Sequence, residues 1–205
     1  MSARATRVIL LPGAYDTPED FITHGFDTLA TDAGIDLQTY PTDLTAVSDG
    51  SLIERLHHKA VLPARAQGGA TRLLLGGISI GALMALTYQD SFPDAVDGLV
   101  LLAPYPGNRT ITRMIAASGG LGGWVPGELD DTEGELRGWR ALQGLSRQRP
   151  APLWLGYGTE DRFAGGHAQM AELLPDDRVF TTAGAHDWPT WRLLWQAMLG
   201  SGLDA

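Results

Sequence analysis

The segment with the clearest chemical potential is Gly77-Ile78-Ser79-Ile80-Gly81. Its serine has a glycine two positions before it and another two positions after it, the spacing of a sharp strand-to-helix turn that exposes a serine hydroxyl. A leucine-rich run precedes the turn, and helix-forming residues follow it from Ala82 to Tyr88. A side chain at either glycine would collide with the neighbouring strand or helix in so tight a turn. The pattern therefore predicts that Ser79 is a nucleophile.

A serine hydroxyl needs a base that removes its proton, and the base needs an acid that orients it. The apolar run Leu153 to Tyr157 predicts a strand that runs directly into the loop holding Asp161, the expected acid, with Glu160 as the alternative. A weaker strand, Arg178 to Thr182, is followed by a loop of small residues that presents His186, the expected base. The order serine, aspartate, histidine, each after a predicted strand, favours a catalytic triad.

The other histidines fit the role of base less well. His24 falls in the first predicted helix, His57 and His58 in the second, and His167 at the start of a later helix after two glycines. Asp187 adjoins His186, and neighbouring side chains point apart, so Asp187 is not expected to be the acid.

Acyl transfer also needs two N–H donors directed at the developing oxyanion, and loss of one donor costs about 3 kcal/mol of barrier. One donor is expected from Ile80, directly after the nucleophile. The other is expected in the loop Leu11 to Asp16, where Gly13 allows the backbone to approach a substrate. Ala14 is the first choice for this second donor, and Tyr15 is the alternative.

The elements that would position these residues alternate between short apolar runs and longer amphipathic segments, which is typical of βα units around a parallel sheet. Six runs are predicted as strands: Arg7 to Leu11, Ile35 to Tyr40, Arg72 to Leu75, Gly98 to Ala103, Leu153 to Tyr157 and the weaker Arg178 to Thr182. The main helices are predicted over Pro18 to Asp32, Ser51 to Gln67, Ile80 to Ser91, Gly165 to Leu174 and Thr190 to Leu199. We therefore expect one three-layer α/β/α domain over residues 1–205.

Residues 104–150 break this alternation with a glycine-rich centre and an acidic stretch, and helical pieces are expected at Thr110 to Ala117 and Glu133 to Gln148. Long irregular excursions in compact domains commonly act as lids or binding loops. We therefore expect a lid-like insertion with a mobile centre. Tyr105, Met114 and Trp124 are candidates either for an acyl pocket or for packing within the insertion.

Composition narrows the classes of partner. The net charge of −9 and the scattered arginines argue against nucleic acid or an anionic membrane as the main partner, because phosphate binding needs clustered cations. The absence of cysteine excludes disulfides and a thiolate nucleophile. The apolar run Val8 to Leu11 is too short for a signal-peptide core, and no stretch approaches the roughly 20 apolar residues of a membrane span. A cytoplasmic location is expected, and no metal or organic cofactor is implied.

With these residues assembled, the chain resembles the α/β-hydrolase superfamily over essentially its whole length. The segment Gly184-Ala185-His186-Asp187-Trp188-Pro189-Thr190-Trp191 is similar to the Gly-x-His-Asp-Trp-x-x-Trp signature of bacterial esterases of the esterase D group. The resemblance implies Ser79 as nucleophile, Asp161 as acid and His186 as base. It also implies a minimal sheet of about six strands without the first two of the larger family members. Pro12-Gly13-Ala14 replaces the His-Gly-Gly pattern of many lipases.

The expected activity is cleavage of a small-molecule carboxylic ester or thioester through an acyl-serine intermediate. Two alternatives stay open. The same triad could transfer an acyl group to an acceptor other than water, as an acyltransferase or as a thioesterase in a biosynthetic pathway. The chain could instead be a non-catalytic ligand-binding protein on a hydrolase scaffold, against which the intact triad counts.

Overall fold

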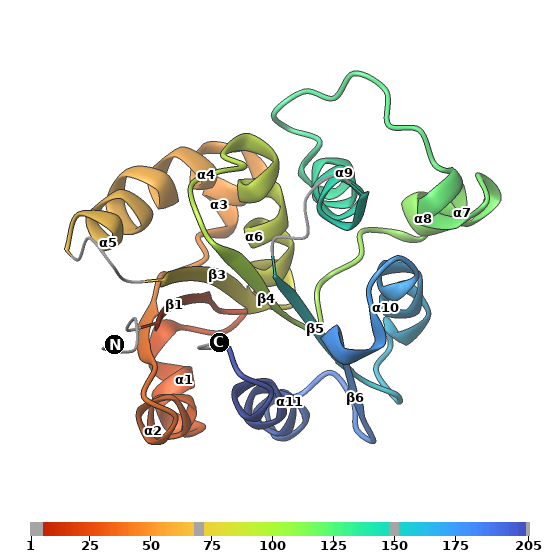
Figure 1. Ribbon diagram of the computed structural model, residues 1–205. Helices are drawn as coiled ribbons and strands as arrows, with labels where there is room; N and C mark the ends of the chain where they lie inside the picture. Colours follow the sequence, from red (N-terminus) through yellow and green to blue (C-terminus); the bar gives the residue numbers. More distant parts are fainter. Residues whose placement is uncertain (1–5, 68–71, 148–151, 204–205) are drawn as a thin grey trace.

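The fold centres on one parallel sheet of six strands (Figure 1). The computed structural model describes residues 6–67, 72–147 and 152–203. The strands follow the order β2-β1-β3-β4-β5-β6 across the sheet, and every neighbouring pair is parallel. Their bounds are β1 (Thr6–Leu11), β2 (Asp36–Thr39), β3 (Arg72–Ile78), β4 (Gly98–Leu102), β5 (Leu153–Gly158) and β6 (Val179–Thr182). The six predicted strands and the expected three-layer α/β fold are confirmed.

Helices cover both faces of the sheet (Figure 1). One face carries α1 (Pro18–Thr23), α2 (Phe26–Asp32) and α11 (Trp188–Gly200). The other carries α3 (Leu44–Ser48), α4 (Ser51–Leu56), the π-helical turn η1 (His57–Val61), α5 (Leu62–Ala66) and α6 (Ile80–Ser91). The chain adds α10 (Ala164–Ala171) and the short 3-10 turn η2 (Asp176–Arg178) between β5 and β6.

Burial of the strands on both sides explains their near-continuous apolar sequences. In β1, Val8 and Leu10 contribute to the core under α1, α2 and α11, whereas Ile9 and Leu11 contribute to the core on the opposite face. Successive side chains of a strand point to opposite faces, so one apolar run supplies two cores. The stripe Trp191, Leu194, Trp195 and Met198 of α11 is buried against the first of these cores, as its helical spacing predicts.

Two of the predicted helices are interrupted. The segment predicted as one helix over residues 18–32 forms α1 and α2, because Gly25 adopts a left-handed conformation with φ 72° between them. The segment predicted as one helix over residues 51–67 contains η1, where His57 stacks on Phe92 with ring centroids 3.9 Å apart. The short helix α3 is an addition to the predicted elements.

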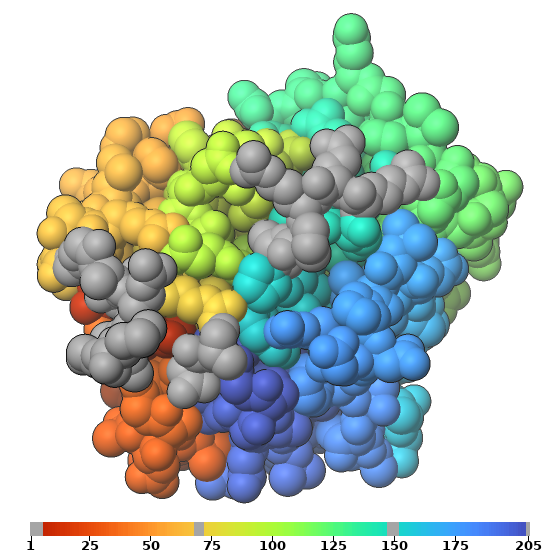
Figure 2. Space-filling model, in the orientation of Figure 1, coloured from red at the N-terminus to blue at the C-terminus, as the bar shows by residue number. Residues whose placement is uncertain are grey.

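The segment after β4 contains α7 (Arg109–Ala117), α8 (Gly120–Gly123) and α9 (Gly134–Arg147). The predicted end of the last helix, Gln148, lies outside the described residues. Helix α9 lies beside α6, and α7 and α8 lie further from the sheet (Figure 1). In the space-filling view, residues 104–135 form the upper right edge of the molecule (Figure 2). The N–H of Leu121 in α8 donates to the Glu172 carboxylate at the end of α10, at 2.9 Å.

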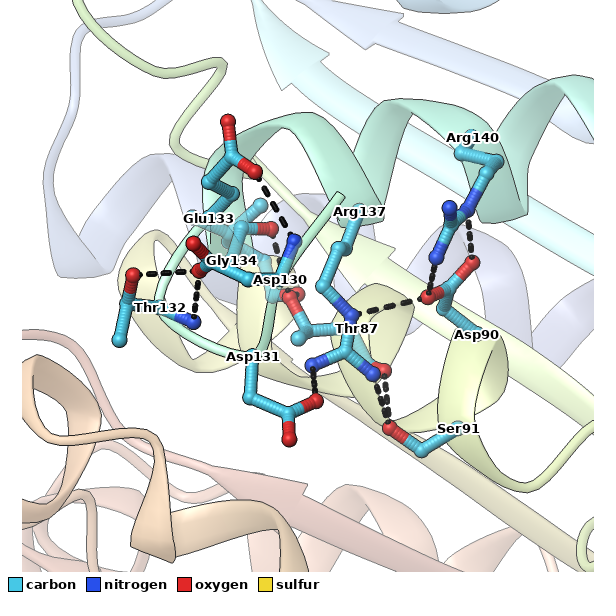
Figure 3. A network of polar contacts seen from close by, with 11 residues as sticks. Thr87, Asp90, Ser91, Asp130, Asp131, Thr132, Glu133, Gly134, Arg137 and Arg140 are labelled. Carbon is cyan, nitrogen blue, oxygen red and sulfur yellow. Dashed lines mark hydrogen bonds and ion pairs between the residues drawn. The ribbon is translucent and has the colours of Figure 1, made fainter. Parts of the chain in front are cut away.

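A buried ion network attaches α9 to the C-terminal end of α6 (Figure 3). The Asp90 carboxylate accepts hydrogen bonds from Arg137 at 2.9 Å and from Arg140 at 2.6 and 2.8 Å. Burial alone would raise the pKa of Asp90, but its hydrogen bonds to Arg140 and Arg137 outweigh burial and lower it. Buried Trp139 of α9 also donates its indole N–H to the Pro106 carbonyl, at 2.9 Å. Helix α9 is thus part of the helical layer over the sheet.

No helix in the described part of the chain is both long enough and apolar enough to cross a membrane.

Candidate active site

Ser79 lies in a strained turn between β3, which ends at Ile78, and α6, which begins at Ile80. Its φ of 54° and ψ of −116° are unfavourable for a residue with a side chain. Hydrogen bonds on both sides of the residue hold this conformation. The Ser79 N–H donates to the Leu102 carbonyl at 3.0 Å, and the Ser79 carbonyl accepts from the Tyr105 N–H at 2.9 Å. The serine backbone is therefore fixed to the end of β4.

The two glycines around Ser79 are required by close backbone contacts. A Cβ on Gly77 would lie 2.6 Å from the Leu11 carbonyl oxygen, and a Cβ on Gly81 would lie 2.6 Å from the Pro12 carbonyl oxygen. Leu11 pairs in register with Gly77, which brings the loop after β1 against the turn. The steric reason that the sequence suggests for these glycines is thus present in the structure.

The three residues predicted to act together lie at the same edge of the sheet, because the carboxyl ends of parallel strands share one edge. His186 Nε2 lies 2.9 Å from the Ser79 hydroxyl oxygen, and His186 Nδ1 lies 2.6 Å from Asp161 Oδ2. In the tautomer that satisfies both contacts, Nδ1–H donates to Asp161 and Nε2 accepts from the Ser79 hydroxyl. The arrangement allows the histidine to take the serine proton.

Asp161, the predicted acid, is the carboxylate that contacts His186. Its side chain is fully buried, and its second oxygen accepts a hydrogen bond from the Phe163 N–H at 2.8 Å. Burial alone would raise the pKa of Asp161, but the hydrogen bonds from His186 and Phe163 outweigh it and lower the pKa below its usual value. The alternative acid, Glu160, is exposed. Asp187 accepts from Thr190 and caps the start of α11.

The loop after β1 lies beside the serine. A Cβ on Gly13 would lie 3.8 Å from the Ser79 Cβ, so the backbone around Gly13 borders Ser79. In the described residues, the N–H groups of Ala14 and Tyr15 donate to no carbonyl, while the Asp16 N–H donates to the Gly13 carbonyl at 3.3 Å. The Tyr15 side chain is 96% exposed. Ile80 begins α6, so its N–H has no carbonyl partner within the helix.

The other histidines have contacts of their own. His24 stacks on Trp188 with ring centroids 4.5 Å apart, and His57 Nδ1 lies 2.8 Å from the Tyr88 hydroxyl. His58 is exposed near Glu54. His167 is fully buried and contacts the Pro104 carbonyl at 2.8 Å.

An aromatic cluster borders the candidate site. The ring of Phe163 lies 5.2 Å from His186 and 5.4 Å from Tyr105 between centroids. Phe163 is absent from the site residues predicted from the sequence, although its place two residues after Asp161 is a usable signal. Of the other aromatic and methionine candidates, Trp124 is buried in the core and Met114 is 40% exposed.

Within residues 6–67, 72–147 and 152–203, no group of three or more histidine, aspartate or glutamate side chains has the arrangement of a metal site.

Known proteins provide an independent comparison. No family model matches the sequence, and no curated protein sequence matches it. Solved structures do match. The fluorophosphonate-binding serine hydrolase F of Staphylococcus aureus has a TM-score of 0.69 at 13% identity, covering 98% of this chain and 84% of the other. S-formylglutathione hydrolase of the same organism has a TM-score of 0.66 at 12% identity, covering 98% and 82%.

A third structure, the monoacylglycerol lipase of Paleococcus ferrophilus, has a TM-score of 0.56 at 15% identity and covers 97% of each chain. The chain has the α/β-hydrolase fold. In this α/β-hydrolase fold, the turn after β3, the loop after β5 and the loop after β6 place Ser79, Asp161 and His186 at one edge of the sheet.

Proposed function

We propose that the protein is a serine hydrolase that cleaves a carboxylic ester or a thioester through an acyl-serine intermediate. The observation that carries the proposal is the continuous hydrogen-bonded line from the Ser79 hydroxyl through His186 to the buried Asp161 carboxylate. A buried carboxylate that accepts from Nδ1 holds the imidazole in the tautomer needed for proton removal and stabilises the imidazolium that forms.

The proposed reaction has two halves. In the first, Ser79 Oγ attacks the acyl carbon while His186 Nε2 takes the serine proton, and the proton then passes to the departing alkoxide or thiolate as the acyl–oxygen or acyl–sulfur bond breaks. In the second, His186 takes a proton from water, whose oxygen attacks the acyl-serine. That proton returns to Ser79 Oγ as the carboxylic acid leaves.

The N–H of Ile80 and the N–H of Ala14 are the proposed oxyanion donors. Ile80 directly follows Ser79, and Ala14 follows Gly13, whose backbone borders Ser79. In the described residues, neither N–H donates to a backbone carbonyl. A preformed pair of donors stabilises the negative charge of the tetrahedral intermediate without reorganisation during the reaction. Tyr15 remains the alternative to Ala14.

The chemistry of the site and its structural neighbours support the proposed substrate class. An acyl-serine mechanism accepts either an oxygen or a sulfur leaving group, and the similar structures include an S-formylglutathione hydrolase and a monoacylglycerol lipase. Phe163 offers apolar surface beside His186, and Tyr105 packs against Phe163. The segment over residues 104–147, which begins with Pro104 and Tyr105, is proposed to influence which acyl group is accepted.

A fluorophosphonate probe tests the proposal, because it labels only an activated serine. The wild-type protein is expected to be labelled, and Ser79→Ala is expected not to be. Equal labelling of both proteins, or none, would overturn the serine-hydrolase proposal and favour a ligand-binding role. A panel of p-nitrophenyl esters and acyl thioesters with different chain lengths would then compare the two leaving groups.

A further inference from the structure

One peptide unit, between Pro104 and Tyr105, connects a buried histidine to the backbone of the candidate nucleophile. Its N–H, which belongs to Tyr105, donates to the Ser79 carbonyl at 2.9 Å. Its carbonyl, which belongs to Pro104, lies 2.8 Å from Nε2 of His167. Because both ends of a planar peptide move together, a contact at its carbonyl fixes the direction of its N–H.

The environment of His167 makes it a donor to this carbonyl. The side chain is fully buried in α10, with the Tyr157 ring 5.1 Å away and the Phe163 ring 6.3 Å away. Burial lowers the pKa of His167 to about 4, so the ring is neutral at neutral pH. A carbonyl oxygen only accepts, so the neutral ring must carry its proton on Nε2.

We propose that His167 is a positioning residue for Ser79, acting through the peptide unit between Pro104 and Tyr105. The inference rests on the proposed function, because it assigns the histidine to the same nucleophile. His167 does not contact the reacting atoms, and its contribution is to hold the backbone of the turn.

The turn needs such support because Ser79 and the segment that contacts it each include a residue with a strained backbone. Ser79 has a φ of 54°, and Ala103, directly before the connecting segment, has a φ of 45°. Conformations of this kind persist only where the surrounding structure over-determines them. A second buried ring N–H, that of Trp139, donates to the Pro106 carbonyl at 2.9 Å, so α9 and α10 both hold the segment that supports Ser79.

A matched pair of variants separates positioning from simple core packing. In His167→Gln, the amide nitrogen reaches as far along the side chain as Nε2 and can still donate to Pro104. In His167→Asn, the amide nitrogen reaches only the position of Nδ1, so this donor is lost. Both variants bury one neutral amide, but Asn is one methylene shorter than Gln and leaves a larger gap. The labelling rate is therefore combined with two readouts that report on the hydrogen bond itself.

The first readout is the rate of fluorophosphonate labelling at Ser79. We expect His167→Gln to be labelled at a rate close to that of the wild type and His167→Asn about tenfold more slowly, the scale of one hydrogen bond. Equal rates for the two variants would overturn the positioning role while leaving the hydrolase proposal intact. Wild-type protein without labelling at Ser79 would instead overturn the hydrolase proposal.

Two further readouts need no activity. Hydrogen exchange at the Tyr105 amide, followed by NMR, is expected to be faster in His167→Asn than in His167→Gln. Nitrogen chemical shifts of the His167 ring in the wild type are expected to show a proton on Nε2. Equal exchange in the two folded variants would overturn the positioning role. A wild-type ring without a proton on Nε2 would overturn it even if the variants fail to fold.

Discussion

The indole N–H of Trp188, the first residue of α11, donates to the Asp16 carboxylate across 3.0 Å, joining the loop after β1 to a helix near the other end of the chain. Asp16 closes the loop that contains the proposed oxyanion donor Ala14, and Trp188 follows the proposed base by two residues. The same indole stacks on His24 and meets Phe21 edge-on. This hydrogen bond therefore connects the proposed oxyanion loop, residues 11–16, to the well-packed start of α11.

Removing that hydrogen bond is expected to slow ester cleavage. Asp16→Ala should lower kcat/KM for a p-nitrophenyl ester by about tenfold, because the oxyanion loop loses its link to Trp188. Asp16→Asn retains an oxygen that accepts from the indole and should stay close to the wild type. A rate for Asp16→Ala equal to that of Asp16→Asn would contradict this role for the hydrogen bond.

Replacement of the buried acid is expected to be far more damaging than replacement of its exposed neighbour. Asp161→Asn should lower kcat by about 10³–10⁴-fold, because the amide no longer holds the required tautomer of His186. Glu160→Gln is the matched control, because Glu160 is exposed and outside the hydrogen-bonded line. Steady-state kinetics on one substrate would compare the two, and a larger loss in the control would reassign the acid.

The free energy of unfolding is expected to fall as the pH is lowered from 6.5 to 4. Burial lowers the pKa of His167 to about 4, so in this window the unfolded chain holds more protons than the folded protein. The contribution of His167 to the free energy of unfolding is fully present above pH 6.5 and is lost as the pH falls towards 4. From pH 7 to pH 5 the loss should be about 2 kcal/mol of unfolding free energy. Urea denaturation at the two pH values measures it.

Variants at two histidines identify the source of that pH dependence. His167→Gln removes the titrating group and should flatten the change between pH 7 and pH 5. His58→Gln alters an exposed ring and should leave the change as in the wild type. Asp161, whose pKa is lowered, contributes only at more acidic pH. An unaltered slope in His167→Gln would assign the pH dependence to other groups.

Alanine at two glycines is expected to have opposite effects. Gly77→Ala would place a Cβ 2.6 Å from the Leu11 carbonyl oxygen, so the strand or the turn must shift, at a cost of at least about 3 kcal/mol. Gly144→Ala in α9 meets no atom within 4 Å and should stabilise the protein by about 0.5–1 kcal/mol. Thermal unfolding of both variants tests the expectation, and a Gly77→Ala protein as stable as the wild type would contradict the close approach of Leu11 to Gly77.

The ion network in Figure 3 gives a prediction for the attachment of α9. Asp90→Ala leaves Arg137 buried without its main partner and should cost about 3–5 kcal/mol of unfolding free energy. Asp131→Ala removes a carboxylate that also pairs with Arg137 but has a side chain 93% exposed, so stability should stay close to the wild-type value. Urea denaturation would measure the free energy of unfolding of both variants. Equal losses would contradict the expectation that the buried carboxylate contributes more than the exposed one.

Much of the fold could be predicted because the patterns that indicate its strands and helices lie within short stretches of the sequence. The leucine-rich run before Gly77 predicts a buried strand, and the apolar spacing after Trp191 predicts a buried helix face. The stacking of His57 on Phe92 could not be predicted, because it joins residues that are distant in the sequence. His57 lies in a π-helical turn where its ring stacks on Phe92 at the end of α6, and nothing near His57 in the sequence indicates that contact.

The sequence by itself determined the six-stranded α/β architecture and the order of Ser79, Asp161 and His186, because strand periodicity and turn glycines are encoded within a few residues. The tertiary structure alone decided that Asp161 contacts His186 while Glu160 faces solvent. Two adjacent carboxylates look alike in the sequence, and only the folded backbone decides which of them points towards the histidine. It alone revealed His167 behind the serine turn, because the two lie 88 residues apart in the chain and meet only through the backbone of Pro104 and Tyr105.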